Sequence, residues 1–121
     1  MSEKQFRFQD LEIWQRGASV SGELFRVADK LEERRLFRFA DQLRGAALSI
    51  TNNIAEGSGS LSDADFANFL NMSRRSVFEV ASILLILSND NFVPSDKVQI
   101  LLAELEEQSR MLLAFMRSLK S

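Results

Sequence analysis

Apolar side chains recur at steps of three and four residues through most of the sequence, and this spacing is the strongest constraint on the fold. The pattern is clearest in residues 66–87 and returns in residues 98–119. Such steps place side chains on one face of an α-helix, whereas a half-buried strand needs alternation with period two. No stretch between turn residues keeps that alternation. The chain is therefore predicted to be all-α.

Polar breaks divide the chain into four predicted helices of similar length. These breaks fall at residues 32–35, 58–60 and 88–94. Long helices joined by short loops are typical of an antiparallel up-down-up-down four-helix bundle. Residues 9–121 are predicted to form this single domain, preceded by an N-terminal arm of residues 1–8. Gly57 or Gly59 is expected to adopt the left-handed conformation that ends the second helix.

The first predicted helix, about residues 9–31, carries two apolar stripes, although one stripe is enough to cover a core. The second stripe needs another surface to bury it, because exposed apolar patches of that size are uncommon on monomers. We therefore expect the protein to form a homo-oligomer through this stripe. The candidate interface residues are Ile13, Val20, Leu24 and Val27.

A line of short polar side chains runs beside the core face of the second predicted helix. Amide and hydroxyl groups suit a half-buried position only when each finds a hydrogen-bond partner. The favoured interpretation is a polar seam that bonds to neighbouring helices and fixes their register, and a ligand or partner site is the alternative. The line consists of Gln42, Ser49, Asn53 and Glu56, and it ends at Gly57.

The composition argues against catalysis. The sequence has no His, Cys or Tyr, which removes the usual zinc ligands, the Cys nucleophile and the His general base. It also has no Gly-rich phosphate-binding loop. We expect neither enzymatic activity nor a metal or cofactor. Because there is no apolar run of membrane-spanning length and no apolar N-terminal segment, we expect a cytoplasmic protein without a membrane partner.

Arginines support a nucleic-acid hypothesis, even though the net charge is −2. If the second and third helices form a hairpin that turns near residue 59, Arg44 lies opposite Arg74 and Arg75. Such a patch would bind phosphates with an affinity that falls as salt rises. The alternative is that the arginines form ion pairs with neighbouring acids. The acids available for this are Glu32, Glu33 and Asp41. The full candidate set is Arg34, Arg35, Arg38, Arg44, Arg74 and Arg75.

Several segments resemble the four-helix-bundle family named for proteins encoded in intervening sequences of 23S ribosomal RNA. The segments are Phe8-Gln9-Asp10-Leu11-Glu12-Ile13-Trp14, Gln42-Leu43-Arg44, Ser49-Ile50 and Asn53-Ile54-Ala55-Glu56-Gly57. In addition, Ser76-Val77-Phe78-Glu79 lies where this family has a Gly-Ser-x-x-Glu element. The resemblance implies a four-helix bundle that assembles as a ring-like homopentamer. Some relatives are accessory proteins beside a reverse transcriptase in diversity-generating retroelements.

The sequence departs from the family pattern at positions that matter for a basic surface. Gly45 and Ser60 stand where the family commonly has Arg, and Arg74 and Arg75 enter the segment that usually reads small-x-Gly-Ser. Basic charge is thereby lost at one end of the hairpin and gained in its middle. We predict a non-catalytic homo-oligomer that serves as an RNA- or DNA-associated accessory module. The alternative is an oligomeric protein-interaction scaffold that binds no nucleic acid.

Overall fold

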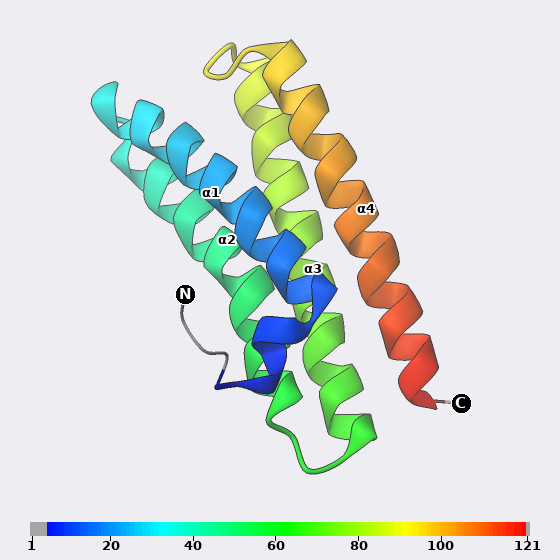
Figure 1. Ribbon diagram of the computed structural model, residues 1–121. Helices are drawn as coiled ribbons and strands as arrows, with labels where there is room; N and C mark the ends of the chain where they lie inside the picture. The colour runs from blue at the N-terminus through cyan, green and yellow to red at the C-terminus, as the bar shows by residue number, and fades with distance from the viewer. Residues whose placement is uncertain (1–4, 121) are drawn as a thin grey trace.

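The computed structural model describes residues 5–120 and consists of helices joined by short connections (Figure 1). The elements are the short 3-10 helix η1 (Arg7–Asp10) and the α-helices α1 (Glu12–Glu33), α2 (Phe37–Ser58), α3 (Asp63–Asn89) and α4 (Ser95–Lys120). Within residues 5–120 there is no β-strand. The prediction of an all-α fold with four long helices is confirmed.

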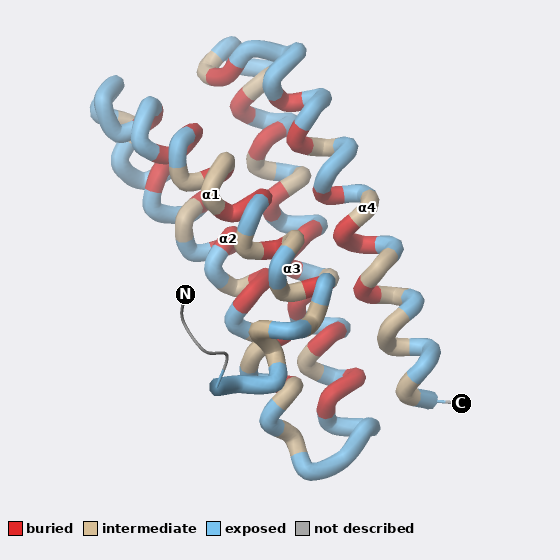
Figure 2. The backbone as a smooth tube through the Cα atoms, viewed as in Figure 1, coloured by how far each residue is buried: buried red, intermediate tan, exposed pale blue. Residues whose placement is uncertain are grey.

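The helices lie side by side, and each packs mainly on its neighbours in the sequence. Contacts are most numerous between α2 and α3, followed by α3 with α4 and α1 with α2, whereas α1 and α4 share far fewer. Figure 2 shows that the buried positions face the interior along each helix. No helix in the described part of the chain has the length and apolar character needed to cross a membrane.

The apolar face of α1 lies inside the bundle. Ile13, Val20, Leu24 and Val27 are at most 5% exposed and belong to the single core of the chain. The prediction that these four residues form an oligomer interface is therefore wrong. Because α1 contacts both α2 and α4, its buried face is wider than a seam against one neighbour, and both sequence stripes contribute to it.

A buried glutamine joins α1 to α4, where helix contacts are fewest. Gln108 is 1% exposed, and its Nε2 donates to the Ile13 carbonyl oxygen at 2.7 Å. Gly17 lies beside it, where a Cβ atom would come within 3.2 Å of that Nε2. A hydrogen bond in this dry position resists sliding of the two helices, because breaking it leaves a buried polar group without a partner.

The turns use residues other than those expected. Neither Gly57 nor Gly59 has a positive φ, and α2 ends at Ser58, followed by Gly59 with φ −89°. The left-handed positions are Arg35 and Asn91, with φ of 65° and 63°. At both turns the next amide bonds back to the helix, from Leu36 to Leu31 and from Phe92 to Leu87, which closes the helix end.

The predicted N-terminal arm is in part packed on the bundle. Residues 1–4 lie outside the described residues, whereas η1 begins at Arg7. The Phe8 ring lies 5.0 Å from the Trp14 ring, and the Arg7 guanidinium lies 5.1 Å above the Phe66 ring. Residues of the arm from Arg7 onward therefore contact the chain's own helices.

Candidate functional site

A polar seam closes the interface between α2 and α3. The hydroxyls of Ser49 and Ser76 lie 2.7 Å apart, and Asn53 Nδ2 donates to the carbonyl oxygen and the hydroxyl of Ser49 at 2.8 and 3.0 Å. Deeper in the interface, the fully buried Ser73 hydroxyl donates to the Ile50 carbonyl oxygen at 2.6 Å. Ser49 bonds across to α3, as the favoured sequence interpretation expects, whereas Asn53 bonds only to Ser49 of its own helix.

The two ends of the predicted polar seam do not belong to it. Gln42 and Glu56 are exposed, and their side chains have no hydrogen-bond partner among residues 5–120. The register set by Ser49 and Ser76 places Gln42 near Ile83, which offers no polar group. Glu56 lies at the end of α2, where α3 presents aromatic rings. The prediction is therefore corrected for both residues.

Gly57 permits the closest approach of α2 to α3. A Cβ atom at this position would lie 2.6 Å from the Phe69 Cβ and 2.8 Å from the Phe66 Cδ1. Real Cβ atoms do not approach other carbons so closely, so any larger residue would push the two helices apart. The role of Gly57 is thus close packing, and the Asn-Ile-Ala-Glu-Gly segment is explained in part by the fold.

Arg44 is tied to acids on α1 and α2 and does not face Arg74 and Arg75. Its guanidinium contacts Asp29 at 2.8 Å, Glu32 at 2.6 Å and Asp41 at 3.5 Å. Hydrogen bonds to Asp29 and then Glu32 raise the pKa of Arg44 above its ordinary value. For this residue the ion-pair alternative holds, with Asp29 as a partner that the sequence interpretation missed.

The predicted hairpin register was wrong for a physical reason. The hydrogen bonds of the seam place Ser76 opposite Ser49 and Ser73 opposite Ile50. The midpoint between these paired residues falls near residue 62, about three residues later than the predicted turn at residue 59. Arg74 and Arg75 therefore lie opposite the middle of α2, and Arg44 lies farther along and on the side that faces α1.

The other arginines occupy two separate places, the connection of α1 with the start of α2 and the middle of α3. Arg34 donates to the Phe92 carbonyl oxygen at 3.1 Å and lies 5.3 Å above the ring of Phe92. Arg74 lies 5.1 Å above the Phe78 ring. Arg35, Arg38 and Arg75 are exposed and have no ion pair in the described part of the chain. The structure thus does not bring the six candidates together into one patch, and their binding to nucleic acid stays a prediction.

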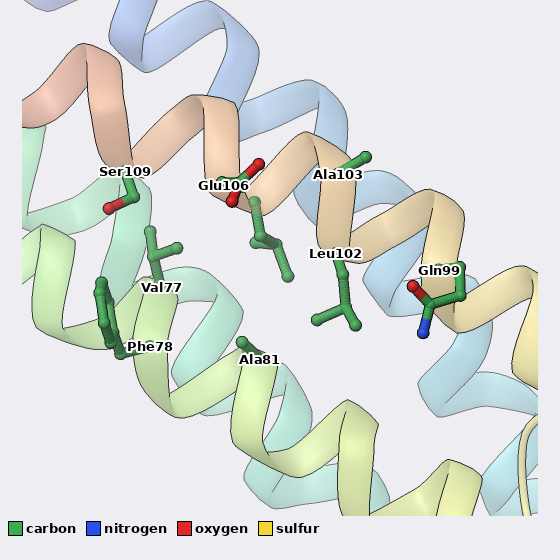
Figure 3. A pocket seen from close by; sticks show the side chains of 9 residues that line it. Val77, Phe78, Ala81, Gln99, Leu102, Ala103, Glu106 and Ser109 are labelled. Atoms are coloured by element: carbon green, nitrogen blue, oxygen red, sulfur yellow. The ribbon is translucent and has the colours of Figure 1, made fainter.

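An open, mostly apolar groove runs between α3 and α4 (Figure 3). Its volume is about 450 Å³, and its apolar lining includes Phe78, Ala81 and Leu102. Phe78 is 57% exposed and Leu85, one heptad later, is 45% exposed. The remaining lining residues are Val77, Gln99, Ala103, Leu105, Glu106 and Ser109.

The sequence contains a sign of the exposed side of α3. Phe78 and Leu85 are seven residues apart and fall outside the core heptad of α3. Apolar residues at helical spacing that do not fit the core stripe indicate a second, exposed stripe. No group of three or more acidic residues that could hold a metal ion occurs within residues 5–120.

Comparison with known proteins gives a family and a fold. The sequence model described as 23S rRNA-intervening sequence protein matches residues 9–114. A crystal structure from Bacteroides thetaiotaomicron, described as a protein with unknown function from the S23 ribosomal protein family, superposes with a TM-score of 0.82 at 20% sequence identity. The match covers 86% of this chain and 97% of that one. No curated protein matches this sequence.

Proposed function

The chain belongs to the 23S rRNA-intervening sequence protein family, and on that premise we propose that it is a non-catalytic, homo-oligomeric protein-interaction scaffold. The proposed protomer is an antiparallel up-down-up-down four-helix bundle, which short connections and contacts between consecutive helices support. The proposed assembly is a ring-like homopentamer. The absence of His, Cys and Tyr from the sequence supports a role without catalysis.

The observation that carries this proposal is the exposure of two large apolar side chains of α3, of which Phe78 lines the α3–α4 groove. Phe78 and Leu85 are about half exposed although they belong to a helix whose other face is fully buried. An exposed apolar groove of this kind marks a binding surface more often than it marks a solvated one. In a homo-oligomer such a surface can be covered by a neighbouring copy of the chain. Any surface that stays uncovered occurs once in every copy of the assembly.

Light scattering coupled to size-exclusion chromatography tests the proposed assembly. The expected result is a single species with the mass of a pentamer of the 13.8 kDa chain. A monomeric mass at all protein concentrations would overturn the homo-oligomer. A stable oligomer of another size would keep the scaffold and overturn the pentamer.

A second candidate function is an RNA- or DNA-associated accessory module, and one observation favours it. Arg35, Arg38 and Arg75 are exposed cations without ion pairs in the described part of the chain. One such site is weak, but repetition around a ring makes weak contacts polyvalent. Arg44 is left out of this candidate surface because three acids already surround it.

The nucleic-acid candidate is tested with nuclease-treated protein, structured RNA and duplex DNA across a salt series. If it is correct, binding weakens steeply as salt rises, and Arg35→Glu with Arg38→Glu abolishes it. The matched control is Arg44→Gln, which removes a cation that is already paired and leaves binding unchanged. Absence of binding at low salt would overturn this second candidate and leave the scaffold.

A further inference from the structure

The α3–α4 groove is largely apolar and has arginines beside one end, which limits the kind of molecule that can bind in it. Phe78, Ala81 and Leu102 give it apolar walls, and Glu106 lines it from α4. An adjoining hollow that shares Phe78 is lined by Arg74 and Arg75, neither of which has an ion pair among residues 5–120. The buried Nε of Arg74 has no hydrogen-bond acceptor. An occupant that suits this groove therefore combines an apolar anchor with a carboxylate about one helical turn away.

The same chain presents such an element on the outer face of α4. The side chains of Asp96, Ile100, Ala103, Glu104 and Glu107 follow one another at helical spacing and form what we call the acidic stripe. At its centre, Ile100 is 65% exposed, which is unusual for a large apolar residue flanked by acids. The stripe and the groove adjoin at Ala103, which belongs to both, whereas Gln99, Leu102 and Glu106 line the groove alone.

The carboxylates of the stripe are available to a partner. Glu104 contacts Arg16 at 3.5 Å and Glu107 contacts Arg110 at 3.5 Å, and in both pairs the side chains are largely exposed. Exposed ion pairs of this length contribute little to stability. Exchanging one of them for a contact with the unpaired Arg74 or Arg75 therefore costs little.

We infer that two copies of this chain join head to tail, with the acidic stripe of α4 on one copy seated in the α3–α4 groove of the next. The inference rests on the proposed homo-oligomer and names its interface. Ile100 enters beside Phe78 and Ala81, and Glu104 reaches Arg74 and Arg75. The lengths agree, because Arg74 to Leu85 and Asp96 to Glu107 each span about 17 Å at the α-helical rise.

The direction of the incoming helix follows from the order of the charges. On α3, Arg74 comes one turn before Phe78, whereas on α4, Glu104 comes one turn after Ile100. Both contacts form together only if the incoming α4 runs opposite to α3. Within one chain, α4 also returns along α3, since Val77 lies beside Ser109 and Ala81 lies toward Leu102 (Figure 3). The two α4 helices therefore run in the same direction.

A rotation about an axis parallel to the bundle keeps the direction of every helix the same from one copy to the next. A head-to-tail contact uses two different surfaces, so each copy keeps one free groove and one free stripe until a ring closes. A two-fold contact between identical surfaces would bring groove against groove and place Arg74 and Arg75 near their own copies. Like charges across an interface are unfavourable, so the charges favour the head-to-tail contact.

The decisive experiment mixes two interface variants and measures mass by light scattering and native mass spectrometry. Phe78→Glu breaks the groove and leaves the stripe intact, whereas Ile100→Glu breaks the stripe and leaves the groove intact. Each variant alone is expected to be monomeric with unchanged helicity. Mixed together, they retain one complete groove and one complete stripe, so the expected product is a 1:1 heterodimer and nothing larger.

The controls separate failure of this interface from failure of the homo-oligomer. Leu48→Glu places the same charge on an exposed apolar residue of α2, 46% exposed and outside both surfaces, and is expected to keep the wild-type mass. A monomeric wild type would overturn the proposed oligomer. A wild-type oligomer that survives both interface variants, or variants that dissociate but do not pair on mixing, would overturn the inferred interface alone. If a Glu variant loses helicity, Phe78→Ser and Ile100→Ser replace the pair.

Discussion

Helix α3 meets α2 and α4 in two different ways. Toward α2, the serine hydroxyls of the polar seam are 2.6–2.7 Å from their partners. At Gly57, the lack of a side chain lets the α2 backbone pack against Phe66 and Phe69 of α3. Toward α4, a groove of about 450 Å³ stays open, and Phe78 is 57% exposed at its edge. One side of the helix satisfies its polar groups within the chain, and the other leaves apolar groups uncovered.

This difference separates residues that maintain the fold from residues that are free to bind. A buried hydroxyl with a partner in the same chain specifies register, and its loss lowers the stability of the fold. An exposed aromatic residue contributes little to a monomer and gains its burial only when another surface arrives. The family-like segments on α2 therefore belong mainly to the fold, whereas the candidate binding surface lies on the other side of α3.

The largest effect is expected at Gly57. In Gly57→Ala the new Cβ atom meets Phe69 and Phe66 inside ordinary contact distance, so we expect a net loss of about 2 kcal/mol in the free energy of unfolding. The matched control is Gly45→Ala, where nothing lies within 4 Å, and there we expect a gain of about 0.5–1 kcal/mol from helix propensity. Urea denaturation measures both, and equal effects would contradict close packing at Gly57.

A smaller effect is expected at the centre of the polar seam. Asn53→Ala removes the amide donor to the Ser49 carbonyl oxygen and hydroxyl, and we expect a loss of about 1 kcal/mol. The Ser49 hydroxyl keeps Ser76 as a partner, which places the loss at the lower end of the range for buried groups. Asn52→Ala, one residue earlier and exposed, is the control. A neutral Asn53→Ala would instead favour a ligand site.

The direct contact between Ser49 and Ser76 is open to a double-mutant cycle. Replacing either residue with Ala removes the bond between their hydroxyls, and we expect a coupling free energy of about 0.5–1 kcal/mol. Because each single variant already loses the shared bond, the double variant is expected to lose less stability than the two single losses added together. The Ser76 hydroxyl also contacts the Met72 carbonyl oxygen at 3.1 Å. Zero coupling would show that the two hydroxyls act independently.

The smallest effect on the folded monomer is expected in the groove. Phe78→Ser removes a half-exposed ring, and at protein concentrations where light scattering finds monomers we expect a loss of no more than about 1 kcal/mol. The loss of the contact between Arg74 and the Phe78 ring accounts for part of that change, since an exposed cation–π contact is worth about 0.5–1 kcal/mol. A loss above about 2 kcal/mol would place Phe78 in the core.

Residue spacing was sufficient to predict the helices and part of the polar seam. Steps of three and four identify the buried face of a helix. At the start of α3, the Ser62 side chain accepts from the Asp65 amide at 3.1 Å, which is typical of Ser before a helix. Spacing does not identify which neighbour a face meets, so the α1 stripe was assigned to an oligomer although α2 and α4 both cover it. The partners of Arg44 depend on the rotation of α2 against α1, which no local pattern encodes.

The open groove was missed for a related reason. An apolar residue outside the core heptad is visible in the sequence, but its exposure depends on how closely α4 approaches α3. The turns show the same limit. A positive φ was predicted for Gly57 or Gly59, but it occurs at Arg35 and Asn91, because helix length and loop geometry decide where a chain must reverse. Local preference is overridden where tertiary packing fixes the turn.

The dependence of the urea midpoint on protein concentration tests most directly whether the two sides of α3 have different roles. Assembly stabilises the folded chain by mass action, so the midpoint of an oligomer rises with concentration. We predict that it rises for the wild type and for Asn53→Ala, with the Asn53→Ala curve lower throughout, and that it stays flat for Phe78→Glu. A flat wild-type curve, or a Phe78→Glu curve that rises like the wild type, would contradict the account.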